Sequence, residues 1–133
     1  MALEKRVKDF EKALYRLEEA YKKALDNRNS DEYPFFRDSA IQRFEFTAEI
    51  MWKALKDYLK EVNGIECRSP KGCIREFFST GNLTPEETTK LLEMIDSRNK
   101  TPHTYHEEIA EEIFSQLTDY IPLIKKVLER IYI

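Results

Sequence analysis

The stretch IQRFEFTAEIMWKALKDYL, Ile41–Leu59, decides the fold of this chain. Its apolar residues recur at alternating steps of three and four, which is the spacing of one face of an α-helix. The same pattern extends from about Phe35 to Val62, and Asn63-Gly64 is typical of a helix end. Because further apolar residues widen this face, we expect this helix to be the most buried one. The face comprises Ile41, Phe44, Ala48, Met51, Leu55, Tyr58 and Val62, and is widened by Phe46, Trp52 and Leu59.

Long amphipathic helices are also predicted at both ends of the chain. The first runs from Ala2 to about Asp26 and the last from about Tyr105 to Ile131. Pro122 lies inside the last helix and removes one backbone hydrogen bond, so we expect a kink there. The inward residues are Leu3, Val7, Phe10, Leu14, Leu17, Tyr21 and Leu25 in the first helix, and Ile109, Ile113, Leu117, Ile121 or Ile124, and Leu128 in the last.

Two shorter helices are predicted between these by their start signals. Ser69 suits the N-cap of the first and Pro70 its first helical position, and Gly81 follows its end. Thr84 and Pro85 have the same roles in the second helix. The expected core residues are Ile74, Phe77, Phe78, Leu91, Leu92, Met94 and Ile95. The sequence therefore predicts one domain over residues 1–133 with an all-α fold, an up-and-down four-helix bundle with an additional short helix.

The 22 basic and 25 acidic residues give a net charge of −3, which argues against non-specific nucleic-acid binding but leaves room for a local basic patch. Three basic residues near the first short helix could guide an RNA backbone, although we favour an ordinary charged face for Arg68, Lys71 and Arg75. Cys67 and Cys73 lack the C-x-x-C spacing of a metal site, and we interpret them as reduced thiols of a cytoplasmic protein rather than as a disulfide. We expect no metal, no cofactor, no signal peptide and no membrane-spanning helix.

The stretch SRNKTPHTYHEE, Ser97–Glu108, contains both histidines of the chain. Thr101 precedes Pro102, which disfavours the helical conformation, so the preceding helix should end near residue 99. The next helix then begins with Thr101 as its cap, or with Thr104 as its cap and Glu107 three residues later as a capping box. Both alternatives place the first histidine of the stretch at a helix start.

Arg98 and His103 have the chemistry of a phosphodiester site. Residues five apart on an unbroken helix point away from each other, so the predicted break allows these two side chains to turn toward one point. Arginine offers a planar charged fork to phosphate oxygens, histidine transfers protons near neutral pH, and a helix N-terminus offers free N–H groups. Glu107 and Glu108 compete for the same positive potential, and an exposed histidine near a helix cap is often only that.

Three polar residues of the central helix could line this site or face solvent. We favour solvent or a structural ion pair for Arg43, Glu45 and Glu49. His106 lies one residue outside the relevant spacing and is treated as a spare.

The blocks IQRFEFTAEIMWKALKDYL, SPKGCIREFF and MIDSRNKTPHTY, in this order, resemble the HEPN superfamily. The resemblance covers nearly the whole chain and is strongest to nucleotidyltransferase substrate-binding proteins, a subgroup that includes the HEPN toxins of toxin–antitoxin pairs. It implies a helical bundle, usually a homodimer, with a small nucleotidyltransferase as partner. The toxin signature Arg-x4-His-x-Tyr is matched in full by Arg98, His103 and Tyr105.

The activity implied by this resemblance is metal-independent cleavage of RNA. The ribose 2′-OH attacks the adjacent phosphate, His103 moves protons, Arg98 stabilises the developing charge, and Asn99 orients the phosphate or His103. A dimer that brings two copies of the motif together supplies both an acid and a base. Tyr105 is the implied acceptor of AMP from the partner enzyme, a change that neutralises the toxin. Two alternatives stay open: a non-catalytic substrate-binding subunit of a nucleotidyltransferase, and a purely structural bundle.

Overall fold

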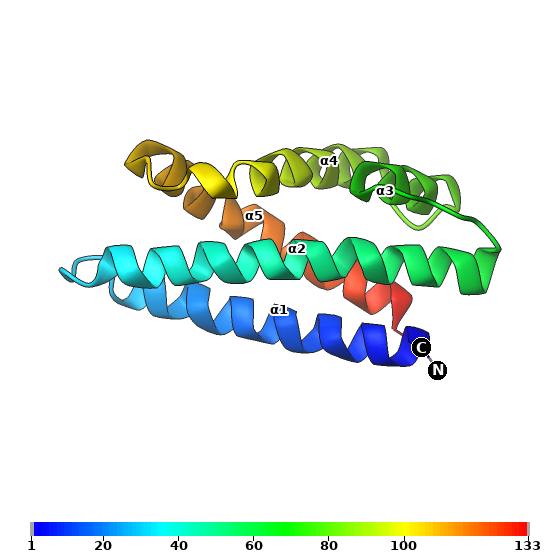
Figure 1. Ribbon diagram of the computed structural model, residues 1–133, viewed down its shortest axis with the longest axis horizontal. Helices are drawn as coiled ribbons and strands as arrows, with labels where there is room; N and C mark the ends of the chain where they lie inside the picture. Colours follow the sequence, from blue (N-terminus) through cyan, green and yellow to red (C-terminus); the bar gives the residue numbers. More distant parts are fainter. Residues whose placement is uncertain (1, 133) are drawn as a thin grey trace.

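Five α-helices and one short 3₁₀ helix make up the chain in the computed structural model, which describes residues 2–132 (Figure 1). In chain order they are α1 (Ala2–Asp26), α2 (Tyr33–Asn63), α3 (Pro70–Ser79), α4 (Pro85–Asn99), η1 (Thr101–His103) and α5 (Glu107–Ile131). α1 and α2 form a long hairpin, α3 and α4 lie together along one side of α2, and α5 crosses behind α2 (Figure 1). The described residues contain no strand, and the predicted all-α bundle with an additional short helix is confirmed.

The helix ends follow local chemistry that the sequence made visible. The hydroxyl of Ser69 accepts a hydrogen bond from the Gly72 N–H at the start of α3. Thr84 and Glu87 form a reciprocal capping box at the start of α4. α2 ends at Gly64, whose φ of 66° is readily reached only without a β-carbon. These three predicted ends are confirmed.

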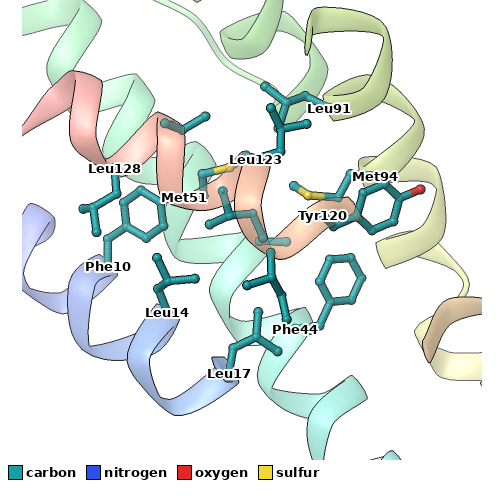
Figure 2. Packing of buried hydrophobic residues seen from close by; sticks show 14 of the residues in the cluster. Phe10, Leu14, Leu17, Phe44, Met51, Leu91, Met94, Tyr120, Leu123 and Leu128 are labelled. Carbon is teal, nitrogen blue, oxygen red and sulfur yellow. The ribbon is translucent and has the colours of Figure 1, made fainter. Parts of the chain in front are cut away.

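The core lies where α1, α2, α4 and α5 meet, and Figure 2 shows part of it. The rings of Phe44 on α2 and Tyr120 on α5 stack with centroids 5.9 Å apart. The Tyr120 hydroxyl lies 3.1 Å from the Ser97 hydroxyl of α4, so its polar end is satisfied inside the bundle. The labelled core residues are Phe10, Leu14, Leu17, Phe44, Met51, Leu91, Met94, Tyr120, Leu123 and Leu128.

Several residues expected in the core are exposed instead. Leu25, Phe46, Val62 and Phe78 have 41–50% of their surface exposed. Neighbouring residues on a helix point about 100° apart, so they cannot both face the core squarely. Ala24 is buried in place of its neighbour Leu25, and Phe77 is buried while its neighbour Phe78 is exposed. The expectation that α2 is the most buried helix is also wrong, since the shorter α5 contributes more buried residues.

Cys67 and Cys73 form a disulfide, with Cα atoms 5.1 Å apart, so the interpretation as reduced thiols is wrong. Residues 64–69 return along α2 before α3 begins (Figure 1), and the first turn of α3 then brings Cys73 beside Cys67. This reversal is a tertiary feature that the spacing of six residues does not reveal. The disulfide also removes the thiol argument for a cytoplasmic location. No helix within residues 2–132 is long and apolar enough to cross a membrane.

Removing the disulfide should destabilise the fold without changing it. For a loop this short the chain-entropy estimate is about 2 kcal/mol of unfolding free energy. We expect the urea concentration at the unfolding midpoint of the wild type to fall when dithiothreitol is added, by the amount that corresponds to this loss of unfolding free energy. The Cys67→Ala/Cys73→Ala variant should match the reduced wild type and should not respond to dithiothreitol. Equal midpoints for the oxidised and reduced wild type would contradict the bond.

Candidate functional site

The segment Arg98–His106, called the motif segment below, joins α4 to α5 through η1 and a turn. α5 begins at Glu107 without a side-chain cap, so both predicted starts of this helix are wrong. The hydroxyl groups of Thr101 and Thr104 are used elsewhere and cannot cap it. Thr101 donates to Glu45 Oε2 at 2.6 Å, and Thr104 donates to the carbonyl of Thr101 at 2.9 Å.

Two carboxylates one turn apart on α2 hold the first half of the motif segment. Glu49 Oε2 lies 3.5 Å from Arg98 Nη2, and Glu49 Oε1 lies 3.5 Å from Lys53 Nζ. Glu45 accepts the short hydrogen bond from Thr101. Glu49 is thus in an ion pair, one of the interpretations left open, and both carboxylates contact the motif segment.

A small hollow of about 140 Å³ lies beside Arg98. Two buried N–H groups of residues that line it, Trp52 Nε1 and Arg98 Nε, have no hydrogen-bond partner within residues 2–132. A buried donor without an acceptor costs free energy, so oxygen atoms of solvent or of a ligand are favoured as its partners. Trp52, expected to be only a core residue, is half-buried. The hollow is lined by Ala48, Glu49, Trp52, Pro70, Ile95, Arg98 and Asn99.

Three rings occupy the second half of the motif segment and face outward. His103 lies in η1, and Tyr105 lies in the following turn with 74% of its surface exposed. The Tyr105 ring centroid is 6.3 Å from that of His103 and 4.3 Å from that of His106. Within residues 2–132 no hydrogen bond joins Arg98 to His103. The structure therefore presents the motif as two neighbouring parts, an arginine beside a hollow and an exposed ring cluster.

A buried arginine fixes the far end of the motif segment. Arg37 is 2% exposed, and its Nη1 lies 2.6 Å from Glu107 Oε2 and 3.2 Å from Glu111 Oε2. The hydrogen bond from Arg37 holds the pKa of Glu107 below its ordinary value. Burial, together with a hydrogen bond to Glu111, raises the pKa of Tyr33 to about 12, so Tyr33 stays a donor at neutral pH. Glu107 is therefore engaged by Arg37 and competes less with a bound anion for positive potential than the sequence suggested.

Arg37 and Trp52 are the residues that sequence reasoning missed. Arg37 had a signal, because it precedes Ile41 by four and Phe44 by seven residues and so lies on the apolar face of α2. A charged residue at such a position is expected to be paired inside the protein. Trp52 had no signal in the sequence. Its indole N–H, unpaired within residues 2–132, distinguishes it from a core tryptophan, and that difference depends on the surrounding residues of the fold.

The other residues that the sequence singled out lie outside this constellation. The side chain of Arg43 makes no ion pair within residues 2–132, and Arg75 is exposed. Lys71 pairs with Asp96 at 2.7 Å, whereas Arg68 lies in the α2–α3 connection beside a second hollow. No group of three or more histidine, cysteine, aspartate or glutamate side chains suited to a metal ion occurs in the described part of the chain.

Comparisons with known proteins place this geometry in a family. Residues 5–132 match the family model described as nucleotidyltransferase substrate binding protein like. A Haemophilus influenzae protein named Probable ribonuclease HepT is 29% identical over 128 residues, which cover 90% of this chain and 86% of that protein.

Two solved structures share the fold. A Thermus thermophilus protein is 45% identical with a TM-score of 0.83, and the match covers 93% of this chain and 99% of that one. A Haemophilus influenzae structure, described as revealing the fold of a substrate binding domain of a nucleotidyltransferase, is 27% identical with a TM-score of 0.80. That match covers 94% of this chain and 98% of the other.

Replacing Arg37 should loosen the start of α5. In Arg37→Met we expect a lower melting temperature near pH 7 and faster amide exchange around residues 105–110, because Glu107 and Glu111 lose their shared cation. The pKa of Glu107 is lowered in the fold, so its contribution is complete above the ordinary glutamate pKa and is lost as the pH falls through the lowered value. The difference from wild type should therefore shrink as the pH falls below the ordinary glutamate pKa.

Arg6→Met is the matched control for this measurement. Arg6 pairs with Asp57 in a partly exposed ion pair, where little stabilisation is expected. A loss of stability in Arg6→Met as large as that in Arg37→Met, or a difference that does not depend on pH, would show that the buried cluster has no special role.

Proposed function

The chain belongs to the nucleotidyltransferase substrate-binding-protein-like family, as its sequence predicted, and we propose that it is a HEPN-type toxin that cleaves RNA without a metal ion. The observation that carries this proposal is the motif segment itself. Arg98 lies in the last turn of α4, and His103 and Tyr105 lie in the short connection that follows; this segment is anchored to the bundle, yet the side chains of His103 and Tyr105 remain exposed. The name of the Haemophilus influenzae relative, Probable ribonuclease HepT, supports the same function.

The proposed reaction uses the ribose 2′-OH as the nucleophile. A base removes its proton, the oxygen attacks the adjacent phosphorus, and the bond from phosphorus to the 5′-oxygen breaks as an acid protonates that oxygen. The products are a 2′,3′-cyclic phosphate and a 5′-hydroxyl. His103 is the proton-transfer group, and since each chain supplies one such histidine, base and acid come from two copies in a homodimer. Its exposed position on η1 leaves His103 available for such a pairing.

Arg98 stabilises the charge that develops on the phosphoryl oxygens. Its side chain is 30% exposed, its buried Nε has no partner within residues 2–132, and its contact with Glu49 is long at 3.5 Å. These features leave the guanidinium with hydrogen-bonding capacity for a phosphate that enters beside it. Asn99, exposed on the same rim of the hollow, is the proposed orienting residue for that phosphate or for His103.

Tyr105 is the proposed point of control by a partner nucleotidyltransferase. With 74% of its surface exposed, the side chain can enter another protein's active site. In the proposed transfer the tyrosine oxygen bonds to the α-phosphorus of ATP and pyrophosphate leaves. The resulting AMP lies beside His103, whose ring centroid is 6.3 Å from that of Tyr105, and its bulk and negative charge exclude RNA.

The second candidate function is a non-catalytic subunit that presents a substrate to a nucleotidyltransferase. The Haemophilus influenzae structure described as a substrate binding domain favours it, and so does the overall charge of −3. This function requires tight binding of the partner enzyme and no RNA cleavage by the purified chain.

RNA cleavage in EDTA distinguishes the two. We expect the wild type to cleave and His103→Ala to lose about a hundred-fold or more of kcat/KM, the usual scale for a general acid–base group. Arg98→Ala should lose about a hundred-fold or more as well, the usual scale for a donor that stabilises charge in the transition state. His106→Ala is the control, because it removes a neighbouring histidine outside the signature and should stay within a few-fold of wild type. All proteins are first matched in helicity and oligomeric state, and mass spectrometry confirms that Tyr105 is unmodified. No cleavage by unmodified wild type would leave the binding subunit as the function.

A further inference from the structure

A second hollow, of about 220 Å³, lies away from the motif segment. It lies between the second half of α2 and residues 64–69, which return along that helix (Figure 1). Three basic side chains line it together with one acidic residue and one cysteine of the disulfide. We call it the basic hollow, and its lining residues are Lys56, Lys60, Glu66, Cys67 and Arg68.

In the described part of the chain, the three cations of the basic hollow form no ion pair, not even with Glu66, which lines the hollow with them. Within residues 2–132, no ion pair engages Lys56, Lys60 or Arg68, whereas the neighbouring Lys53 and Lys71 are both paired. The chain has a net charge of −3, so unpaired cations are not the result of an excess of basic residues. Like charges that converge on a concave surface concentrate positive potential there and attract an anion.

The basic hollow lies on the same side of α2 as the contact with Arg98. Lys53, Lys56 and Lys60 follow Glu49 by four, seven and eleven residues, which is the spacing of one helix face. At a rise of 1.5 Å per residue, Lys56 is about 10 Å and Lys60 about 16 Å along the helix from Glu49. A strand of a few nucleotides covers such a distance.

We propose that the basic hollow binds a backbone phosphate of a single-stranded RNA, so that the strand runs along α2 from Arg98 to Lys60 and Arg68. The inference rests on the proposed ribonuclease function and adds a second point of contact to it. No aromatic ring of residues 2–132 lines the basic hollow, so these residues offer no platform for base stacking there, and the hollow is suited to the sequence-independent backbone. The disulfide of Cys67 restrains the segment that carries Arg68.

Binding of a strand that cannot be cleaved tests this directly. The probe is a single-stranded oligonucleotide of about ten nucleotides with 2′-deoxy sugars throughout, and the variant is Lys56→Gln/Lys60→Gln/Arg68→Gln. We expect binding to weaken about ten-fold or more, and the slope of log K against log salt to become shallower by about 0.7 for each phosphate that is no longer neutralised. The control, Lys8→Gln/Lys12→Gln/Arg16→Gln, removes the same charges from exposed positions on α1 and should bind as the wild type does.

Cleavage of two substrates separates this inference from the proposed function. A dinucleoside phosphate contains only the scissile phosphate, so the wild type and the hollow variant should cleave it at the same rate. On the longer RNA strand the hollow variant should lose kcat/KM in proportion to its decrease in affinity. If the wild type cleaves RNA and the hollow variant equals it on both substrates, only the inference fails.

Three further outcomes overturn the inference. Equal weakening in the α1 control would show an effect of net charge alone. A wild type that neither binds nor cleaves RNA would remove the proposed function and the inference together. A hollow variant that binds the oligonucleotide normally but loses its nucleotidyltransferase partner would assign this surface to protein docking. If the wild type binds RNA without cleaving it, the proposed ribonuclease function fails, and the affinities of the wild type and the hollow variant still show whether the basic hollow binds the strand.

Discussion

The guanidinium of Arg37 is the group on which the arrangement of the motif segment depends. It is almost fully buried, and a buried charge is tolerated only when it is paired and hydrogen-bonded. Its partners across the contact between α2 and α5, Glu107 and Glu111, both belong to the start of α5. Shifting that start along the chain would separate the cation from these carboxylates, so the ion cluster fixes where α5 begins and where the motif segment ends.

α2 therefore holds the motif segment at both of its ends. Arg37 engages the start of α5, while Glu45 and Glu49, two to three turns further along α2, engage Thr101 and Arg98. The anchoring residues are not themselves the proposed proton-transfer group, His103, or the proposed AMP acceptor, Tyr105. This division leaves His103 and Tyr105 free to project from a connection whose ends are held by short polar contacts. The arrangement combines a defined backbone position with exposed side chains, which is what the proposed pairing with a second copy and the proposed modification by a partner enzyme would require.

Much of the fold could be predicted because its signals are local. The Ser69-Pro70 and Thr84-Pro85 starts and the glycine after α2 act through atoms within a few residues, so sequence patterns identify them. The start of α5 could not be predicted in this way, because Thr101 bonds to Glu45, 56 residues earlier, instead of capping a helix. The prediction of reduced thiols failed for the same reason, because Cys67 and Cys73 are brought together by the return of the chain along α2.

The candidate site shows the same boundary between local and tertiary information. The signature Arg98, His103 and Tyr105 is readable in sequence, but its supporting carboxylates and the half-buried Trp52 are defined only by packing. Net charge is misleading for a related reason. Glu49, Glu87, Asp96 and Glu107 are engaged in ion pairs with basic residues, so much of their negative charge is compensated locally. Within residues 2–132, Lys56, Lys60 and Arg68 are in no ion pair, so an acidic protein can present cationic side chains on the same face of α2 as its candidate site.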